Sequence, residues 1–245
     1  MDRPTPSPSS SPDSGPGLVV ALDGPGSSGK SSVGAAAASE LGYRMVDTGL
    51  LYRALTWLAL ERHVPATDET GLVALVPEVV LTPDDAGRLD RVLVDGRDVT
   101  DEVHTARVDE NVSAFARVPG VRAAFLPVQR ALAGKGGIVF AGRDIGTVVL
   151  PDADLKIFLD ASVEERARRR SEERDLAPDS PEARSILAQL RRRDDIDRNR
   201  AVAPLRPAED ALHIVTDGNT FPETVRAVVD AVRTASRARE VASGR

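Results

Sequence analysis

The 245-residue chain lacks cysteine altogether and contains only one tryptophan, two tyrosines and five phenylalanines. Without cysteine it has no disulfide framework and no thiolate metal site. No apolar run approaches the length needed to cross a membrane, and the first 17 residues lack the apolar stretch of a signal peptide. We therefore expect a cytoplasmic protein with no membrane partner.

The chain also lacks an excess of positive charge. The formal net charge is −6, whereas generic nucleic-acid binding favours a basic excess. Even the charge-dense stretch from Ser162 to Arg200 is nearly neutral, with 11 arginines against 10 acidic residues. We expect no nucleic-acid partner. The chain has only three lysines against 29 arginines, so a lysine at a motif position is informative.

That lysine is Lys30, in the stretch LVVALDGPGSSGKSS from Leu18 to Ser32. The stretch fits the phosphate-binding P-loop pattern, in which backbone N–H groups and the start of a helix face phosphate oxygens. The lysine adds a mobile charge for the β- and γ-phosphates, and a hydroxyl beside it can ligate Mg²⁺. The alternative is a Gly/Ser-rich turn, which the strand–loop–helix order disfavours. The predicted nucleotide-binding residues are Gly24, Pro25, Gly26, Ser27, Ser28, Gly29, Lys30, Ser31 and Ser32.

Strand and helix patterns alternate along most of the chain. The expected strands are 18–22, 43–46, 137–141, 155–159 and 212–215, and the expected helices include 30–41, 50–62, 162–174 and 181–198. Ser162 with Glu165 predicts a capping box at the start of the helix 162–174, and Thr220 with Glu223 predicts one at the start of a closing helix. The closing helix repeats apolar residues at helical spacing, at Val225, Val228, Val229 and Val232. This order predicts an α/β fold with a doubly wound parallel sheet flanked by helices. Ligands bind such sheets at the carboxyl ends of the strands, where we expect Asp23, Asp47, Arg143, Asp144 and Asp160 to lie.

The alternation breaks between about 73 and 136, where short β-like pieces (78–82, 91–94) precede helical stretches (105–117, 119–133). We expect an inserted α+β lobe at 73–136, between core segments 18–72 and 137–235. The Pro/Ser/Gly-rich residues 1–17 predict a disordered tail, and the polar end from about Ala235 predicts a flexible C-terminus at 236–245.

Three clusters beyond the P-loop carry further candidates. Thr48 and Arg53 follow the second strand, where a guanidinium is well placed to grip a phosphate. Arg143 and Asp144 end the third core strand, either as ligand contacts or as a structural ion pair. The third cluster is one helix face formed by Arg193, Asp197 and Arg200, which suits a sugar and a phosphate but reads more plainly as a solvated helix. The three histidines have no ligand-like spacing.

Together the motifs DGPGSSGKSS, DTGLLYR, AGRDIGTVVLPDADLKIFLDAS and RRRDDIDRNRAVAPL resemble the bacterial cytidylate kinases, in order and spacing, over about residues 18–235. The resemblance implies a five-stranded P-loop kinase core, a nucleotide-monophosphate-binding insert and a helical lid at about 162–200. It also implies transfer of the ATP γ-phosphoryl group to CMP or dCMP with Mg²⁺. The implied enzyme is a phosphotransferase of pyrimidine nucleotide metabolism, and we expect a monomer.

Carried over by position, the resemblance implies a role for each candidate. Ser113, Arg122 and Asp144 match cytosine readers, and Arg193 and Asp197 match sugar contacts. The contacts around the acceptor phosphate are matched by Thr48, Arg53, Arg143 and Arg200, and the implied catalytic residues are Lys30, Arg143 and Arg200. Many relatives have Gly before the second P-loop hydroxyl, whereas here Ser31 and Ser32 both qualify as the Mg²⁺ ligand.

Two other functions remain open on the sequence. The chain could be a P-loop kinase for another nucleotide or metabolite. It could also be a nucleotide-dependent switch, although the guanine-reading tetrapeptide Asn-Lys-x-Asp is absent from the sequence.

Overall fold

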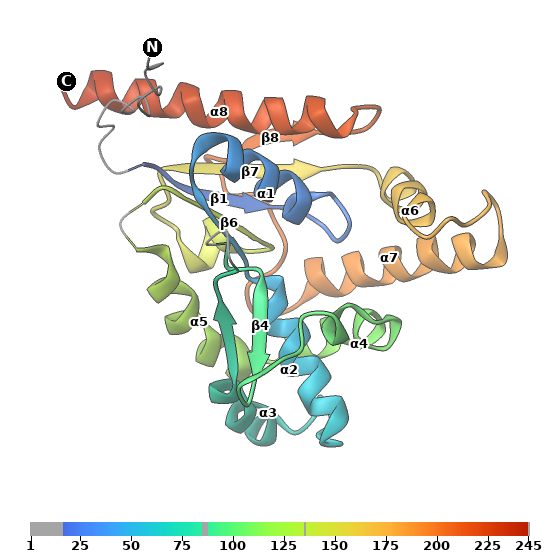
Figure 1. Ribbon diagram of the computed structural model, residues 1–245. Coiled ribbons are helices and arrows are strands. Elements are labelled where there is room, and N and C mark those ends of the chain that lie inside the picture. Colours follow the sequence, from blue (N-terminus) through green and yellow to red (C-terminus); the bar gives the residue numbers. More distant parts are fainter. Residues whose placement is uncertain (1–16, 85–87, 135, 245) are drawn as a thin grey trace, which may run out of the picture.

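The computed structural model describes residues 17–84, 88–134 and 136–244. The predicted disordered tail therefore lies, apart from Gly17, outside the described residues. The centre of the fold is a parallel sheet in the order β2-β6-β1-β7-β8 (Figure 1). Its strands are β1 (Val19–Asp23), β2 (Arg44–Asp47), β6 (Ile138–Gly142), β7 (Leu155–Asp160) and β8 (Leu212–Val215). This confirms the predicted doubly wound α/β fold.

The sheet forms because its central strands are continuously apolar and can be buried on both faces. β6 is buried along its whole length, and β1 pairs with it from Val19↔Ile138 to Asp23↔Gly142. That register brings Asp23 and Gly142 to the same edge of the sheet. The charged residues that follow β1, β2 and β6 therefore lie at one edge, as predicted.

One face of the sheet is covered by α1 (Lys30–Leu41) and α8 (Phe221–Ala242), which pack against each other (Figure 1). Valines at the predicted helical spacing in α8, from Val225 to Val232, are buried there with Val33 and Ala37 of α1. The other face carries α2 (Gly49–Glu61) and α5 (Pro119–Ala133). The sheet thus separates two apolar layers.

The segment predicted as an insert extends below the sheet in Figure 1. It begins inside α3 (Glu69–Leu75), which starts four residues before the predicted boundary at 73, and contains the 3₁₀ turns Val76–Glu78 and Glu102–His104, α4 (Ala106–Ala116) and α5. Between them lies an antiparallel sheet of β3 (Val79–Thr82), β4 (Arg91–Val94) and β5 (Arg97–Asp98). Both predicted strands are present, and β5 is an additional two-residue strand that the sequence did not indicate.

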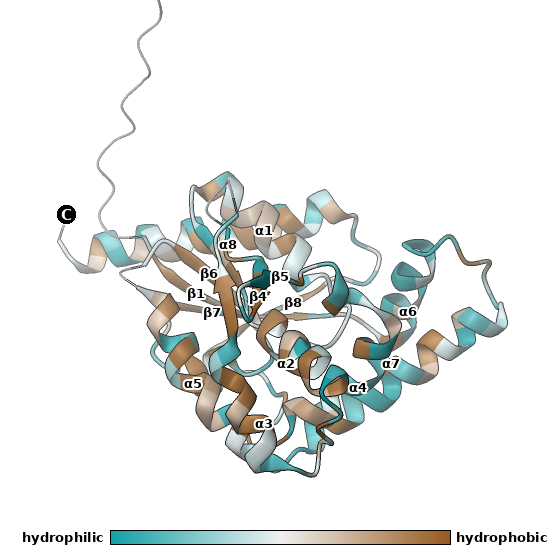
Figure 2. Ribbon diagram, turned by 60° about the horizontal axis from the view of Figure 1, so that its bottom comes forward, coloured by the Kyte–Doolittle hydropathy of each residue, from teal (hydrophilic) through white to brown (hydrophobic). Residues whose placement is uncertain are grey.

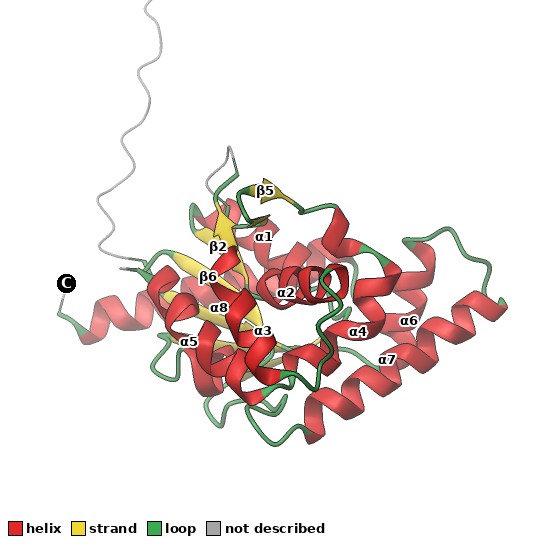
Figure 3. Cartoon of the chain, turned by 90° about the horizontal axis from the view of Figure 1, so that it is seen from below, coloured by secondary structure: helices red, strands yellow, loops and turns green. Residues whose placement is uncertain are grey.

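The helices α6 (Val163–Glu172) and α7 (Pro181–Asn199) pack on each other beside α4 (Figure 3). Their own buried apolar cluster is small, comprising Ala167, Ile186 and Leu190. The two helices are also the most hydrophilic part of the fold in Figure 2, in contrast to the brown strands. Polar contacts, more than apolar burial, therefore hold α6 and α7 over the rest of the molecule.

Three details differ from expectation. The end from about Ala235, predicted to be flexible, is helical, because α8 continues to Ala242. Ile145–Val149 forms a short π-helix where no helix was predicted. Ser162 accepts from the Glu165 N–H, but the Glu165 carboxylate accepts from Arg168 and Arg169 instead of completing a capping box. Within the described part of the chain, no helix is long and apolar enough to cross a membrane.

Candidate active site

A cleft of about 1120 Å³ opens at the carboxyl ends of β1, β2 and β6. Its walls come from the P-loop, the start of α2, α4 of the insert, the α6–α7 pair and the start of α8. The residues predicted from separate parts of the sequence line this one cleft. Among them are Lys30, Thr48, Arg53, Ser113, Arg122, Arg143, Asp144, Arg193, Asp197 and Arg200.

The P-loop end of the cleft is shaped by close backbone approach. A Cβ at Gly24 would stand 2.1 Å from the Leu159 carbonyl oxygen, and Gly29 has a φ of 87° at the start of α1. The buried Lys30 ammonium donates to the Pro25 carbonyl at 2.7 Å and to Ser28 Oγ at 3.3 Å. Burial, followed by repulsion from Arg143, lowers the pKa of Lys30 well below its usual value. An anion in the loop would stabilise this ammonium.

Asp23 links the P-loop to the segment after β6. Its carboxylate accepts hydrogen bonds from the backbone N–H groups of Ile145 and Gly146, both at 2.8 Å. Burial raises the pKa of Asp23 to about 6, against the lowering effect of those two hydrogen bonds. This carboxylate was noted only as a strand-end residue in the sequence, because its partners lie more than 120 positions away.

Oxygen donors meet at the end of β2. The Ser31 hydroxyl donates to Asp47 Oδ2 at 2.5 Å, and Asp47 Oδ1 accepts from the Gly49 N–H at 2.9 Å. Ser32 is exposed, like Ser31. A hydroxyl and a carboxylate beside a phosphate-binding loop are the donor types that Mg²⁺ prefers. Among the residues that the structure describes, no group of three or more His, Asp or Glu side chains gathers to hold a metal.

The far end of the cleft is organised around Asp144. This buried carboxylate pairs with Arg122 through one oxygen and with Arg200, at 3.3 Å, through the other. The Arg122 guanidinium also lies 5.2 Å from the centre of the Tyr52 ring, and its buried Nε has no partner. Ser113, on α4, is buried nearby and lines the same cleft. A carboxylate, a guanidinium and a hydroxyl thus converge on one buried region.

The remaining candidates lie between these two ends. Arg143 Nε donates to Asp197 Oδ2 at 3.2 Å, and Thr48 Oγ1 donates to the Ala141 carbonyl at 2.9 Å. Burial, followed by repulsion from Arg143 and Arg53, lowers the pKa of Arg193 to about 10. The buried Arg193 Nε also has no partner. This crowding of cations around unpaired donors indicates a site for an anionic ligand.

The geometry agrees with the comparison to known families, in which the family model described as "Cytidylate kinase" matches residues 20–234. The chain belongs to the cytidylate kinase family. A curated cytidylate kinase from Pelotomaculum thermopropionicum is 44% identical over 220 residues, covering 89% of this chain and 97% of that protein. One from Mycobacterium leprae is 41% identical, covering 90% of this chain and 98% of that protein. Family membership identifies the chain as a phosphotransferase of the kinase type.

Among solved structures, a gluconokinase from Sinorhizobium meliloti 1021 superposes with a TM-score of 0.50. The match covers 93% of this chain and 98% of that one at 16% sequence identity, so it bears on the fold alone. It supports the assignment of this cytidylate kinase family member to the P-loop kinase fold.

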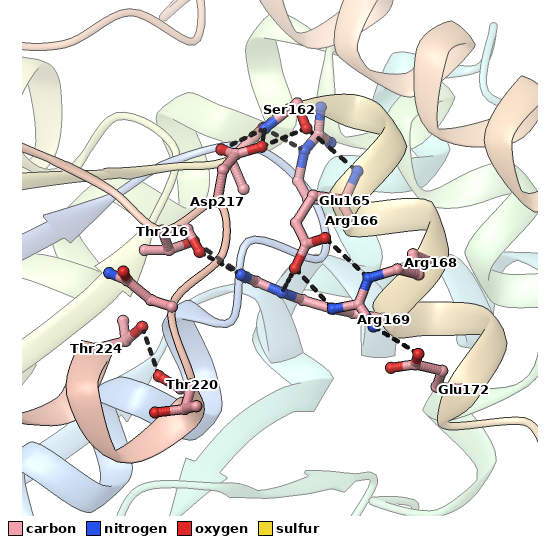
Figure 4. A network of polar contacts seen from close by, with 12 residues as sticks. Ser162, Glu165, Arg166, Arg168, Arg169, Glu172, Thr216, Asp217, Thr220 and Thr224 are labelled. Carbon is pink, nitrogen blue, oxygen red and sulfur yellow. Dashed lines mark hydrogen bonds and ion pairs between the residues drawn. The ribbon is translucent and has the colours of Figure 1, made fainter.

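Beside the P-loop lies a polar network that the sequence did not indicate (Figure 4). Arg169 donates to Thr216 Oγ1 at 3.0 Å and to the Thr216 carbonyl at 2.5 Å, while Asp217 accepts from Ser162. Arg166, only 2% exposed, pairs with Asp194 and donates to the Gly26 carbonyl at 2.9 Å. These contacts join α6 to the P-loop and to the segment before α8.

Asp109 is another residue that the sequence did not indicate. It lies on α4, and Arg53 Nη2 donates to its Oδ1 at 2.6 Å. The sequence places the two residues 56 positions apart. A single acidic residue near the start of a helix offers no local signal for such a contact.

Proposed function

We propose that this member of the cytidylate kinase family transfers the γ-phosphoryl group of ATP to CMP or dCMP, giving CDP or dCDP and ADP. The observation that carries the proposal is that Asp144, paired with Arg122, lines the same cleft as Ser113 and Lys30. Cytosine presents an N4 amino donor beside the N3 and O2 acceptors. A carboxylate accepts from the amino group, while a guanidinium and a hydroxyl donate to the ring acceptors.

The same set disfavours uracil. Uracil has an N–H at position 3 and a carbonyl at position 4, so it would set donor against donor and acceptor against acceptor. A site whose buried polar groups are left unpaired rejects such an analogue strongly. We therefore infer that Asp144 discriminates CMP from UMP.

The phosphate groups would lie between the two ends of the cleft. In the proposal the P-loop N–H groups and Lys30 hold the donor phosphates, and Arg53, Arg143, Arg200 and Thr48 hold the acceptor phosphate. Phosphoryl transfer depends on in-line placement and on neutralising the equatorial oxygens, which a row of fixed cations supplies. The attacking oxygen is already anionic, so a strong general base and a covalent intermediate are not needed.

The donor set beside the P-loop fits Mg²⁺. We infer that the Ser31 hydroxyl, or that of Ser32, supports the ion together with Asp47, because Ser31 and Asp47 already meet at 2.5 Å. When bound, the ion would neutralise charge on the donor phosphates. The chain's own residues orient the two substrates around it.

In the proposal the α6–α7 pair acts as a lid. Its contacts with the rest of the molecule are polar, and its own apolar cluster is small, so it can separate from the cleft at modest cost. Closure excludes water and limits hydrolysis of ATP.

The test is an acceptor screen that measures ADP release with CMP, dCMP, UMP and AMP at matched concentrations. CMP or dCMP is expected to give the highest kcat/KM. Faster turnover of UMP or AMP would refute the cytosine assignment and favour a kinase for a different nucleotide.

A further inference from the structure

Asp109 is surrounded by cations from three separate parts of the fold. Its Oδ1 lies 2.6 Å from Arg53 Nη2 of α2 and 3.6 Å from Arg193 Nη1 of α7. Its Oδ2 lies 3.1 Å from Arg170 Nη2 of α6 and 3.4 Å from Arg174 Nη2, just beyond the end of α6. One carboxylate of the insert therefore contacts arginines from both the core and the α6–α7 pair.

The carboxylate is ionised in this setting. Asp109 is 8% exposed, and burial acting alone would raise its pKa. The surrounding arginines outweigh burial, Arg53 most of all, and the net effect is a lowered pKa. A buried anion with four arginine neighbours is a strong electrostatic link, because each guanidinium would otherwise repel the others.

The link reaches the acceptor side of the cleft through Arg53. Arg53 Nη1 donates to the Val103 carbonyl at 3.0 Å while Nη2 donates to Asp109, so both contacts fix the same guanidinium plane. Arg193 is drawn toward the same carboxylate and keeps its buried Nε unpaired. An anion such as Asp109 does not itself bind a phosphate, but it orients the arginines that do.

We infer that Asp109 is a positioning residue that fastens the α6–α7 pair to the insert and holds Arg53 and Arg193 in place for the acceptor nucleotide. The inference rests on the proposed function, since it assigns the two arginines to a nucleoside monophosphate. It adds a residue that contacts no substrate and acts through its neighbours. On the lid side of this link, Arg170 and Arg174 belong to α6 and the residues just after it, and Arg193 belongs to α7.

The first test compares Asp109→Asn with Glu110→Gln. Both remove one negative charge, but Glu110 is exposed on the same helix and takes part in none of the ion pairs seen among the described residues. Asp109→Asn is expected to raise KM for CMP about tenfold, the scale of one hydrogen bond to a charged group, with a smaller change in kcat. Glu110→Gln should match wild type.

A second variant separates the link from simple folding of the insert. Arg170→Gln combined with Arg174→Gln removes the two contacts from the α6 side of the lid and leaves the Arg53–Asp109 and Arg193–Asp109 contacts intact. It should raise the fraction of ATP γ-phosphoryl groups lost to water relative to those transferred to CMP. Asp109→Asn should raise the same fraction. An unchanged fraction in the double variant overturns the lid part of the inference.

Distance between the two elements provides a readout independent of activity. The chain has no native cysteine, so spin labels on Glu110→Cys and Ala188→Cys, both exposed, report the α4–α7 separation without interference. Adding Asp109→Asn should lengthen and broaden that distance distribution in the ligand-free protein. An unchanged distribution, or a KM for CMP that stays level or falls, overturns the proposal. If wild type itself fails to phosphorylate CMP, the proposed function fails instead, and the distance measurement still decides the link.

Discussion

Among the single side chains that line the cleft, Asp144 is the one we assign to the base of the acceptor nucleotide. Its carboxylate neutralises two buried arginines and, in the proposal, accepts from the cytosine amino group. Asp144→Asn should therefore raise KM for CMP by ~10-fold or more, the range for one weakened hydrogen bond to a charged group, and leave KM for ATP nearly unchanged. The asparagine can also donate to the uracil carbonyl, so the CMP-to-UMP ratio of kcat/KM should fall.

Steady-state assays of ADP release with each acceptor measure both effects. The matched control is Asp195→Asn, because Asp195 is exposed on the neighbouring helix α7. Circular dichroism would verify that the variant is folded, since loss of the Asp144 charge leaves Arg122 and Arg200 without their partner. Equal losses for ATP and CMP, with an unaltered acceptor ratio, would remove Asp144 from base recognition.

At the P-loop end, Asp23 predicts a dependence of stability on pH. Burial raises the pKa of Asp23 from 3.8 to about 6. Between these two pH values the carboxyl group is protonated in the folded state and ionised in the unfolded state. The contribution to stability is present below about pH 4 and is lost as the pH rises through 6. A shift of about two units corresponds to roughly 3 kcal/mol.

Asp23→Asn does not titrate, so the difference in unfolding free energy between wild type and variant should shrink or reverse as the pH rises from 4 to 7. Urea denaturation at a series of pH values measures it. Asp210→Asn offers a control of opposite sign, because the hydrogen bond from Lys156 lowers the pKa of Asp210 and that contribution is lost on acidification. A pH-independent difference for Asp23→Asn would contradict the assignment.

At the level of elements, α8 depends on its first turn. Thr220 accepts from the Glu223 N–H, and the Glu223 carboxylate accepts in return from the Thr220 N–H at 2.8 Å, which completes a capping box. Thr220→Ala should lower the free energy of unfolding by about 1 kcal/mol, because the Glu223 N–H loses its acceptor and the Glu223 carboxylate loses the hydroxyl donor. Thr70→Ala, at an exposed position inside α3, should be neutral or slightly stabilising.

Chemical denaturation measures the capping effect, and a loss of equal size in both variants would count against it. The capping signal Thr220–Glu223 was readable in the sequence because it is local, and the same holds for the five strands and most helix ends. The π-helix after Asp144 was not predictable, because Asp23 holds its N–H groups from across the sheet. The length of α8 was underestimated because its last turns are polar, although they remain helical and Arg239 pairs with Asp154 of the core at 3.2 Å.

The candidate site shows the same division between local and distant signals. The P-loop and the Arg143–Asp144 pair follow strands whose ends could be located from apolar patterns. The ion pairs of Asp109 and Arg166 were not predicted, because their partners come from other elements and a lone charged residue on a helix usually faces solvent. The residues predicted to contact the nucleotides could therefore be located from local sequence patterns, whereas the residues that hold those side chains in position could not.

At the scale of the whole molecule, a chain with a net charge of −6 concentrates cations in one cleft. The pKa of Arg200 is lowered by burial and then by Arg122, and that of Lys30 by burial and then by Arg143. The ligand-free fold therefore retains unrelieved repulsion among buried cations. A phosphate dianion would relieve it, so the folded state should gain more from CMP than from cytidine.

At a CMP concentration of about 100 times its Kd, the gain in stability is about 2.7 kcal/mol, which corresponds to a rise of roughly 5–10 °C in the unfolding midpoint. The same concentration of cytidine should give a much smaller rise. The difference between the unfolding midpoints with CMP and with cytidine should decrease when the salt concentration rises from about 0.05 M to about 0.5 M, because screening weakens the attraction between the phosphate and the cations.

Arg143→Gln should also decrease this difference, whereas Arg226→Gln, at an exposed position on α8, should leave it unchanged. Two results would contradict this prediction: equal unfolding midpoints with CMP and with cytidine, or a difference between them that does not change with salt. Either result would mean that the cleft does not bind the phosphate of CMP through its cations. The assignment of Arg53, Arg143 and Arg200 to the acceptor phosphate would then be wrong.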